Sequence, residues 1–136
     1  MVHIEQITQE LTWKIRQAEL NPELPLSAIK LAEDDLGTHL GLFYNNQLIT
    51  VVSLFQYGNE LQFRKFATIK TYQKMGFGSQ MMAYILDYAT QQQIQKVWCN
   101  ARSTATNFYE KFGFSATPEI FSKNSINYIV MQKIMD

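Results

Sequence analysis

The chain has 136 residues, 46% of them hydrophobic, and its 12 Lys and Arg residues balance its 12 Asp and Glu residues. This length predicts a single domain spanning residues 1–136, with enough apolar side chains for one buried core. The balanced charge argues against a nucleic-acid-binding surface, which usually needs a strong basic excess. The single cysteine, Cys99, excludes an internal disulfide and favours a reducing compartment, so we expect a cytoplasmic protein.

Membrane association is not expected from the hydropathy pattern. No apolar stretch approaches the roughly 20 residues that an α-helix needs to cross a bilayer. The N-terminal stretch MVHIEQITQE lacks the basic-then-apolar order of a signal peptide.

The first half of the chain predicts one strand, two helices and a three-stranded meander. A short strand is expected at residues 2–4, a helix at 12–20, and a second short helix at 24–32 with Pro25 in its first turn. Asn45 and Asn46 tolerate positive φ and therefore predict a two-residue hairpin turn before a β-branched strand at residues 48–55. Gly58 and Asn59 form the next turn, ahead of a third strand at residues 61–69.

The second half predicts alternating helices and strands. A long helix should follow the glycine-containing stretch YQKMGFGSQMM and run to about Gln92, because Met81, Met82, Ile85, Leu86 and Ala89 recur at helical spacing. Further along, we expect a strand at residues 96–100, a helix at 104–112 ended by Gly113, and at least one more strand at 127–132. The order predicts a mixed α/β domain with a right-handed crossover between parallel strands at residues 61–100.

Gly76 and Gly78 are unusual at the start of a helix, because glycine is costly in helix interiors. A strand, a glycine loop and a helix N-terminus together favour an anion site, since the first turn has unpaired N–H groups and a positive dipole end. The amides of residues 74–79 could cradle a phosphate or pyrophosphate. The chain contains neither GxxxxGK[ST] nor GxGxxG, which argues against a nucleoside-triphosphate or dinucleotide site.

The stretch FATIKTYQKMGFGSQMMAYIL resembles the cofactor motif of the GNAT superfamily of N-acetyltransferases, [Gln/Arg]-x-x-Gly-x-[Gly/Ala]. Taken alone this motif is weak, and a glycine turn without a ligand is the simpler alternative. Two further stretches match the family in order and spacing: KVWCNARSTATNFYEKFGF, and the hairpin HLGLFYNNQLITVVSL ahead of the cofactor strand. The resemblance is strong over residues 61–114 and looser elsewhere.

The resemblance implies a mostly antiparallel central sheet flanked by helices, with a splayed pair of parallel strands that binds CoA. It implies acetyl-CoA as co-substrate, no metal, a primary amine of a small molecule or peptide as acceptor, and a homodimer as one oligomeric state seen in the family. The cofactor-binding residues implied are Phe66, Ala67, Thr68, Gln73, Lys74, Met75, Gly76, Phe77, Gly78, Ser79, Asn100 and Asn107. An amide of the strand at residues 66–68 would polarise the thioester carbonyl.

Tyr109 is the residue that the resemblance implies as general acid, giving its proton to the departing thiolate. The alternative is that it packs in an apolar helix beside Phe108 and Phe112. Asn100 and Asn107 have a similar alternative, because asparagine also caps helices and turns.

The general base is not evident, since the predicted cofactor strand LQFRKFATI carries no carboxylate. The run Glu33-Asp34-Asp35 lies where the family often builds its acceptor site, although a solvated loop is the simpler interpretation. Arg16 could attract an acceptor carboxylate or be solvated, and His39 is expected to be structural. Cys99 is expected to be a buried strand residue rather than a nucleophile.

The sequence is compatible with two other functions. A CoA-binding sensor or interaction module could keep the fold without turnover, and the missing strand carboxylate is its support. A domain whose glycine loop binds nothing is the second.

Overall fold

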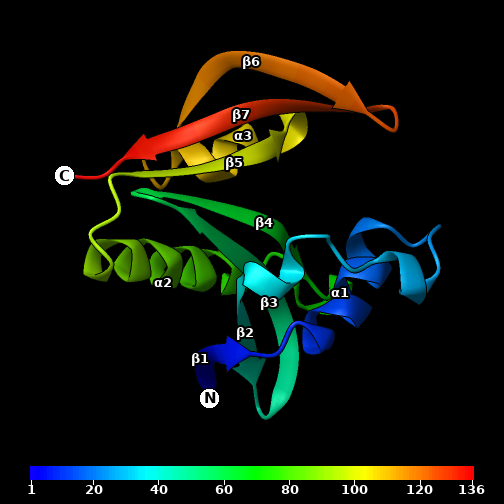
Figure 1. Ribbon diagram of the computed structural model, residues 1–136. Coiled ribbons are helices and arrows are strands. Elements are labelled where there is room, and N and C mark those ends of the chain that lie inside the picture. Colours follow the sequence, from blue (N-terminus) through cyan, green and yellow to red (C-terminus); the bar gives the residue numbers. More distant parts are fainter. The chain divides into compact units, whose positions relative to one another are not determined.

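The computed structural model describes residues 1–136 as a seven-stranded sheet with flanking helices (Figure 1), and this confirms the predicted mixed α/β fold. The strand order is β1-β2-β3-β4-β5-β7-β6. The strands are β1 (Val2–Ile7), β2 (Thr38–Tyr44), β3 (Gln47–Tyr57), β4 (Glu60–Thr68), β5 (Lys96–Arg102), β6 (Ser115–Lys123) and β7 (Ile126–Ile134). The α-helices are α1 (Glu10–Leu20), α2 (Phe77–Gln91) and α3 (Thr106–Glu110), and short 3-10 helices are η1 (Leu26–Ala28), η2 (Asp34–Leu36), η3 (Lys70–Tyr72) and η4 (Ser103–Ala105).

The chain divides into two compact units. The first comprises Met1–Phe55 and Phe63–Ile85, and the second Gln56–Gln62 and Leu86–Asp136. No helix is both long and apolar enough to span a bilayer.

A tight hairpin organises the first unit. Asn45 and Asn46 have φ of 50° and 68° and join β2 to β3 as the predicted two-residue turn. The two strands are antiparallel, as are β1 and β2. Most side chains in the middle of β3 are buried, which accounts for its β-branched composition.

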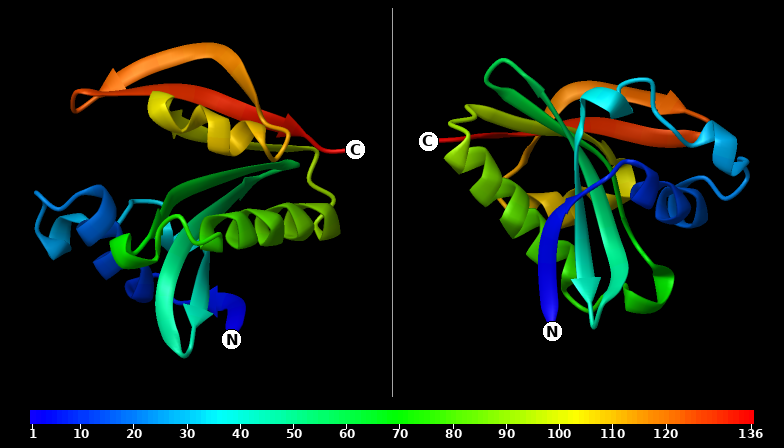
Figure 2. Two further views of the ribbon diagram at one scale, coloured as in Figure 1. Left: turned by 180° about the vertical axis from the view of Figure 1, so that it is seen from behind. Right: turned by 60° about the horizontal axis from the view of Figure 1, so that its bottom comes forward.

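The helix α1 packs against this sheet through an apolar cluster. Ile15 of α1 joins Ile7, Val51 and Ala67 in one buried group. Figure 2 shows α1, in blue, beside the β1–β3 strands. Burial of these four side chains stabilises the packing of α1 against the sheet.

The predicted helix at residues 24–32 is wrong. The structure has only the single 3-10 turn η1 there, preceded by Pro25 in an extended conformation with ψ of 156°. Because Pro25 is extended, no helix can include it. The few residues that follow form a short 3-10 turn and cannot nucleate an α-helix.

The second unit contains the predicted parallel pairing. Leu61 of β4 lies opposite Val97 of β5, with the neighbouring residues in register on either side. The connection between them includes α2, which places Met81, Met82, Ile85 and Ala89 among the buried side chains. The predicted helix–strand order at residues 61–100 is therefore confirmed.

One helix and one strand of the second unit differ most from expectation. The predicted helix at residues 104–112 shortens to η4 and α3, and Gly113 ends it with φ of 90°. The strand β6 was not predicted. Its sequence SATPEIFSK contains a proline and is almost wholly exposed, so it lacks the alternating apolar signal of a half-buried strand.

Candidate active site

The glycine loop leads directly into α2. The first helical hydrogen bond of α2 runs from the Gln80 N–H to the Gly76 carbonyl, at 3.1 Å. The N–H groups of Phe77, Gly78 and Ser79 precede that bond, and in a helix such groups have no partner within the helix itself. The loop therefore ends in a set of amides and a positive dipole end suited to an anion.

The loop needs glycine at position 76, because the backbone there is left-handed. Gly76 has φ of 88°, and a Cβ built on it would meet no atom within 4 Å. Glycine is thus required by its conformation, and the space above it is open. Lys74 also has positive φ, 64°, and both Lys74 and Met75 are exposed. This open, exposed backbone fits the approach of a phosphate group.

Gln73 is exposed, but its side chain anchors the loop. Its Nε2 donates to the Thr68 carbonyl at 2.9 Å and, more weakly, to Glu19 Oε1 at 3.5 Å. The Glu19 carboxylate also accepts from the Lys70 N–H at 3.1 Å. Both amide hydrogens of Gln73 are therefore used within the protein, so its contribution to a ligand is to hold the loop against the end of β4.

An aromatic group fixes the start of α2. The buried ring of Phe77 lies 5.2 Å from the ring of Tyr44 and 6.2 Å from that of Tyr72, and the Tyr72 hydroxyl donates to Gln47 Oε1 at 3.2 Å. This group ties the first turn of α2 to the β2–β3 hairpin. The Phe77 side chain is thus structural, and only its backbone N–H can face a ligand.

The cofactor strand predicted at residues 66–68 is the end of β4. Ala67 is buried, and the Thr68 hydroxyl forms a hydrogen bond with the Thr50 hydroxyl at 2.9 Å. Just before Phe66, Lys65 has φ of 58°, which interrupts the regular strand. Such a break redirects the backbone groups that follow it, and left-handed non-glycine residues concentrate at functional sites.

The left-handed backbone at Lys65 is a feature of the site that the sequence did not predict. Lysine has no preference for positive φ, so the residue types in β4 do not predict this break in the strand.

The second unit holds the remaining predicted residues. Tyr109 of α3 is half-buried, with its ring 5.2 Å from that of Phe108 and 6.1 Å from that of Phe114. Burial, reinforced by the nearby Cys99, raises the pKa of the Tyr109 hydroxyl, and Arg102 offsets this only in part. Tyr109 therefore keeps its proton across the physiological range, as a general acid must before it acts.

The two asparagines and the cysteine differ in exposure. Asn100 and Asn107 are exposed, on β5 and in the first turn of α3. Cys99 is buried, as predicted, and burial raises the pKa of its thiol to about 12. A thiol that stays protonated is a poor nucleophile.

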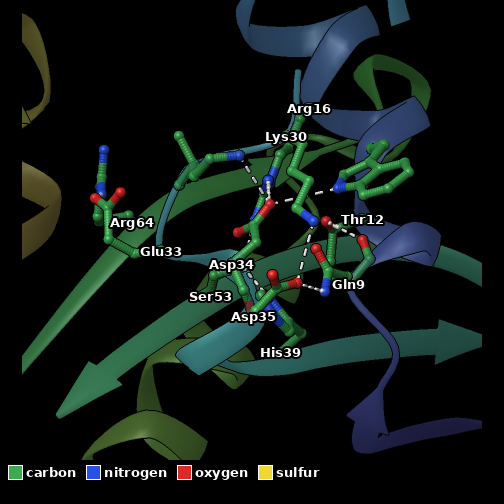
Figure 3. A network of polar contacts seen from close by, with 12 residues as sticks. Gln9, Thr12, Arg16, Lys30, Glu33, Asp34, Asp35, His39, Ser53 and Arg64 are labelled. Atoms are coloured by element: carbon green, nitrogen blue, oxygen red, sulfur yellow. Dashed lines mark hydrogen bonds and ion pairs between the residues drawn. The ribbon is translucent and has the colours of Figure 1, made fainter. Parts of the chain in front are cut away.

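Arg16 and Asp34 overturn two expectations (Figure 3). Both side chains are almost wholly buried, and Arg16 Nη1 donates to Asp34 Oδ2 at 2.7 Å while Nη2 donates to Oδ1 at 2.9 Å. Arg16 is thus neither solvated nor available to an acceptor, and Asp34 is not part of a solvated loop. The pair is structural, because it has no exposed atoms to offer a ligand.

The protonation of Asp34 follows from these contacts. Burial acts to raise the pKa of the carboxyl, but the Arg16 hydrogen bonds and charge, the Leu31 N–H at 2.9 Å and the Trp13 indole together hold it below its usual value. Asp34 is therefore ionised at neutral pH.

His39 extends this network, which confirms its structural role. Its Nε2 lies 2.9 Å from the Asp34 carbonyl, which can only accept, so Nε2 carries a proton. Its Nδ1 lies 2.7 Å from Ser53 Oγ, which also accepts from Arg16 Nη2 at 2.7 Å. The Ser53 hydroxyl can in turn donate to His39 Nδ1, whereas Arg16 Nε is buried without a hydrogen-bond partner.

The neighbouring Glu33 behaves differently. Its Oε1 accepts from Arg64 Nη1 of β4 at 2.7 Å, and its side chain is 41% exposed. Arg64 also lies over the Phe55 ring, 5.7 Å from its centroid. The sequence did not predict this pairing, because the two residues are far apart in the chain.

The predicted site residues fall in both units. Residues 66–68 and 73–79 belong to the first unit, where the Gln73–Thr68 hydrogen bond joins them. Asn100, Asn107 and Tyr109 belong to the second. Across the structure, no group of three or more His, Cys, Asp or Glu side chains is placed to hold a metal ion.

Comparison with known proteins defines the family. Residues 25–135 match the acetyltransferase (GNAT) domain family. The chain is 30% identical to the uncharacterized N-acetyltransferase YitI of Bacillus subtilis (strain 168), over 99% of this chain and 97% of YitI. The chain therefore belongs to the GNAT acetyltransferase family, and it is an acyltransferase.

Solved structures share this fold. One is from Lactobacillus plantarum and has been assigned as an N-acetyltransferase; it has a TM-score of 0.86 and 23% identity, covering 98% of this chain and 97% of that one. A GNAT family acetyltransferase from Elizabethkingia anophelis, with acetyl-CoA bound, has a TM-score of 0.78 and 18% identity, covering 98% of each chain.

Proposed function

We propose that this protein transfers the acetyl group of acetyl-CoA to a primary amine of a small molecule or peptide. Membership of the GNAT family and the acetyl-CoA bound to the Elizabethkingia relative support this co-substrate. The observation that carries the proposal is the open left-handed backbone at Gly76, directly before the first free amides of α2.

The loop at residues 73–79 binds the pyrophosphate of acetyl-CoA. The N–H groups of Phe77, Gly78 and Ser79 donate to its oxygens, and Lys74 adds positive charge. Gln73 acts indirectly, by holding the loop to the Thr68 carbonyl. Met75 contributes its backbone, since its thioether is a weak partner for phosphate.

The end of β4 binds the pantetheine arm and the thioester. Backbone groups of Phe66, Ala67 and Thr68 pair with the amides of the arm, and an N–H following the left-handed Lys65 polarises the thioester carbonyl. In the second unit, Asn100 and Asn107 bind the cofactor through their polar side chains, and both are exposed.

Tyr109 supplies the proton that the departing thiolate needs. The acceptor amine attacks the thioester carbon, the C–S bond breaks, and the thiolate takes the proton of the Tyr109 hydroxyl. The amine loses its own proton to solvent or to a group outside residues 61–68, because this segment has no carboxylate. Tyr109 regains its proton from solvent.

Thermal unfolding with and without acetyl-CoA tests the first part of this proposal. Ligand at about 100 times its dissociation constant stabilises by roughly 2.7 kcal/mol, which raises the midpoint by on the order of 5–10 °C. The absence of a shift at saturating acetyl-CoA would contradict cofactor binding.

Release of free CoA on addition of a panel of amines tests the transfer step. We expect release to depend on the amine. A protein that binds acetyl-CoA but shows no amine-dependent release over a broad panel would be a CoA-binding sensor.

A further inference from the structure

The outer edge of β6 carries the short segment Glu119-Ile120-Phe121-Ser122-Lys123. β6 is the last strand in the sheet order (Figure 1), and its residues are exposed along almost its whole length. Ile120 is 74% exposed and Phe121 is 40% exposed. An edge strand with exposed apolar side chains is a position where a further strand can add.

The turn between β6 and β7 fixes which backbone groups face outward. Asn124 and Ser125 have φ of 53° and 65°, so they form a two-residue turn with both central residues left-handed. Lys123 and Ile126 are the closing pair of this hairpin. The closing pair of such a turn exchanges its hydrogen bonds within the hairpin.

The direction of the backbone N–H and C=O groups alternates along β6, and this shows which residues face β7 and which face outward. Phe121 pairs with Tyr128 and lies two residues before Lys123 of the closing pair. Because backbone groups alternate in direction along a strand, Phe121 also directs its N–H and C=O toward β7. Ile120 and Ser122 direct theirs to the outer side, where the sheet has no further strand. The free edge thus offers two donors and two acceptors, centred on Phe121.

The edge available for pairing is short. Pro118 has no N–H to donate, and the Glu119 N–H is held by Thr117 Oγ1 at 3.2 Å within the irregular part of β6. A partner strand therefore finds its backbone hydrogen bonds at Ile120 and Ser122.

We propose that two copies of this chain associate through β6, antiparallel, about a two-fold axis at Phe121. In that register Ile120 lies opposite Ser122 of the second copy, so the outward N–H and C=O groups of both residues pair. Phe121 lies opposite Phe121 of the second copy in a non-hydrogen-bonded pair, where side chains approach most closely.

Charge is the argument for a second copy as the partner. The same register places Glu119 opposite Lys123 of the second copy at each end of the segment. Opposite charges at facing positions stabilise antiparallel pairs, and like charges oppose them. Few strands of arbitrary sequence would match both the charges and the outward backbone groups of this edge.

Aromatic packing supplies the apolar centre. The Phe121 ring already stacks on Tyr128 at 5.2 Å with an interplanar angle of 17°. Pairing about Phe121 would join the two stacks into one aromatic cluster, which aromatic rings favour beyond their buried area. Since the strand segment is short, we expect a weak dimer that dissociates on dilution.

Sedimentation of the full chain at increasing concentration tests the proposal. We expect the wild type to approach twice its 15.8 kDa as its concentration rises toward about 100 µM. Glu119→Lys and Lys123→Glu each place like charges opposite one another at both ends of the interface. Each variant should weaken the dimer on the order of tenfold or more.

The charge pattern also predicts two rescues. The double variant Glu119→Lys/Lys123→Glu restores opposite charges and should dimerise like the wild type. An equimolar mixture of the two single variants should form heterodimers, because every facing pair is then complementary. A second variant, Ser122→Pro, removes an outward N–H and should abolish the dimer while its circular dichroism remains that of the wild type.

Three results would overturn the proposal. They are a wild type that remains monomeric at the highest concentration, a dimer unaffected by the single charge reversals, and a loss of dimer that the double reversal fails to restore.

Discussion

Arg16 and Asp34 hold α1 against η2 through two parallel hydrogen bonds, at 2.7 and 2.9 Å, with both side chains shielded from water. The guanidinium fork matches the carboxylate in a geometry that lysine cannot reproduce. The same Asp34 carboxylate accepts from the Leu31 N–H, which fixes the chain ahead of η2. One arginine thus organises a segment with almost no regular structure of its own.

Removing one member of this pair should be strongly destabilising. We expect Asp34→Ala to lower the free energy of unfolding by about 3–5 kcal/mol, because it leaves the Arg16 charge buried and unpaired. Urea denaturation followed by circular dichroism measures this. Changing both residues, as in Arg16→Met/Asp34→Leu, should cost less than the sum of the single changes.

The exposed pair Lys30–Asp35 is the matched control. Its atoms lie 3.1 Å apart, but the side chains are 44% and 67% exposed. Asp35→Ala should cost far less stability than Asp34→Ala, because solvent screens an exposed pair. Equal losses at Asp34 and Asp35 would contradict the structural role of the buried pair.

Asp34 should also contribute to the pH dependence of stability. Because its pKa is lower in the folded chain than the ordinary 3.8, the unfolded chain binds the proton more readily as the pH falls. The contribution is fully present above about pH 4 and is lost as the pH falls through the folded-state pKa.

Comparison with Asp34→Asn isolates this contribution. The stability difference between wild type and Asp34→Asn should be largest at neutral pH and shrink in acid. The pKa of Asp35 is lowered by the Gln9 and Lys30 contacts, which both proteins keep, and the opposing effect of the Asp34 charge is present only in the wild type. A difference that stays constant down to pH 3 would argue against an ionised Asp34.

Gly76 and Gly58 provide a matched pair for the phosphate loop. Both have positive φ, 88° and 63°, and a Cβ at either position meets nothing within 4 Å. Glutamate at either site should therefore cost a similar 1–2 kcal/mol or so of stability through backbone strain. Only Gly76→Glu places a negative charge beside the proposed pyrophosphate.

We expect Gly76→Glu to abolish acetyl-CoA binding and Gly58→Glu to preserve it, as measured by titration calorimetry. Gly76→Ala should bind more weakly than wild type but better than Gly76→Glu, because it carries the strain without the charge. Normal binding by Gly76→Glu would show that the loop is not the cofactor cradle.

Tyr109→Phe should separate binding from chemistry. Loss of a general acid typically slows transfer by roughly 10²–10⁴-fold. Acetyl-CoA affinity should be unchanged, since the ring remains. The exposed Tyr57 serves as a control, because Tyr57→Phe should leave both quantities unaltered.

The pH–rate profile provides a second check on Tyr109. Because burial raises its pKa above the ordinary 10, the hydroxyl keeps its proton at higher pH than a free tyrosine. Transfer should therefore show no decline from its ionisation up to about pH 9. Unchanged transfer by Tyr109→Phe would remove it as the acid.

Local signals in the sequence predicted much of the fold. Asn45 and Asn46 predicted a turn because both tolerate left-handed backbone. The four-residue spacing of Met81, Ile85 and Ala89 predicted a buried helix face. In contrast, β6 owes its position to pairing with β7, and its exposed sequence carries no pattern that would reveal it.

The buried polar network could not be predicted for a related reason. A run such as Glu33-Asp34-Asp35 looks uniformly soluble, yet Asp34 is buried and its neighbours are not. The difference depends on Arg16, which lies in another element, and single-residue preferences contain no information about such partners. The same limit applies to the left-handed Lys65 in β4.

The parallel pairing of Leu61 with Val97 has a consequence for the time course of folding. The β2–β3 and β6–β7 hairpins close through two-residue turns and can form within microseconds. The β4–β5 contact closes only after the intervening α2 segment has been brought back along the sheet, at a larger entropic cost. We therefore expect hairpin formation to be early and the parallel ladder to be the late, rate-limiting event.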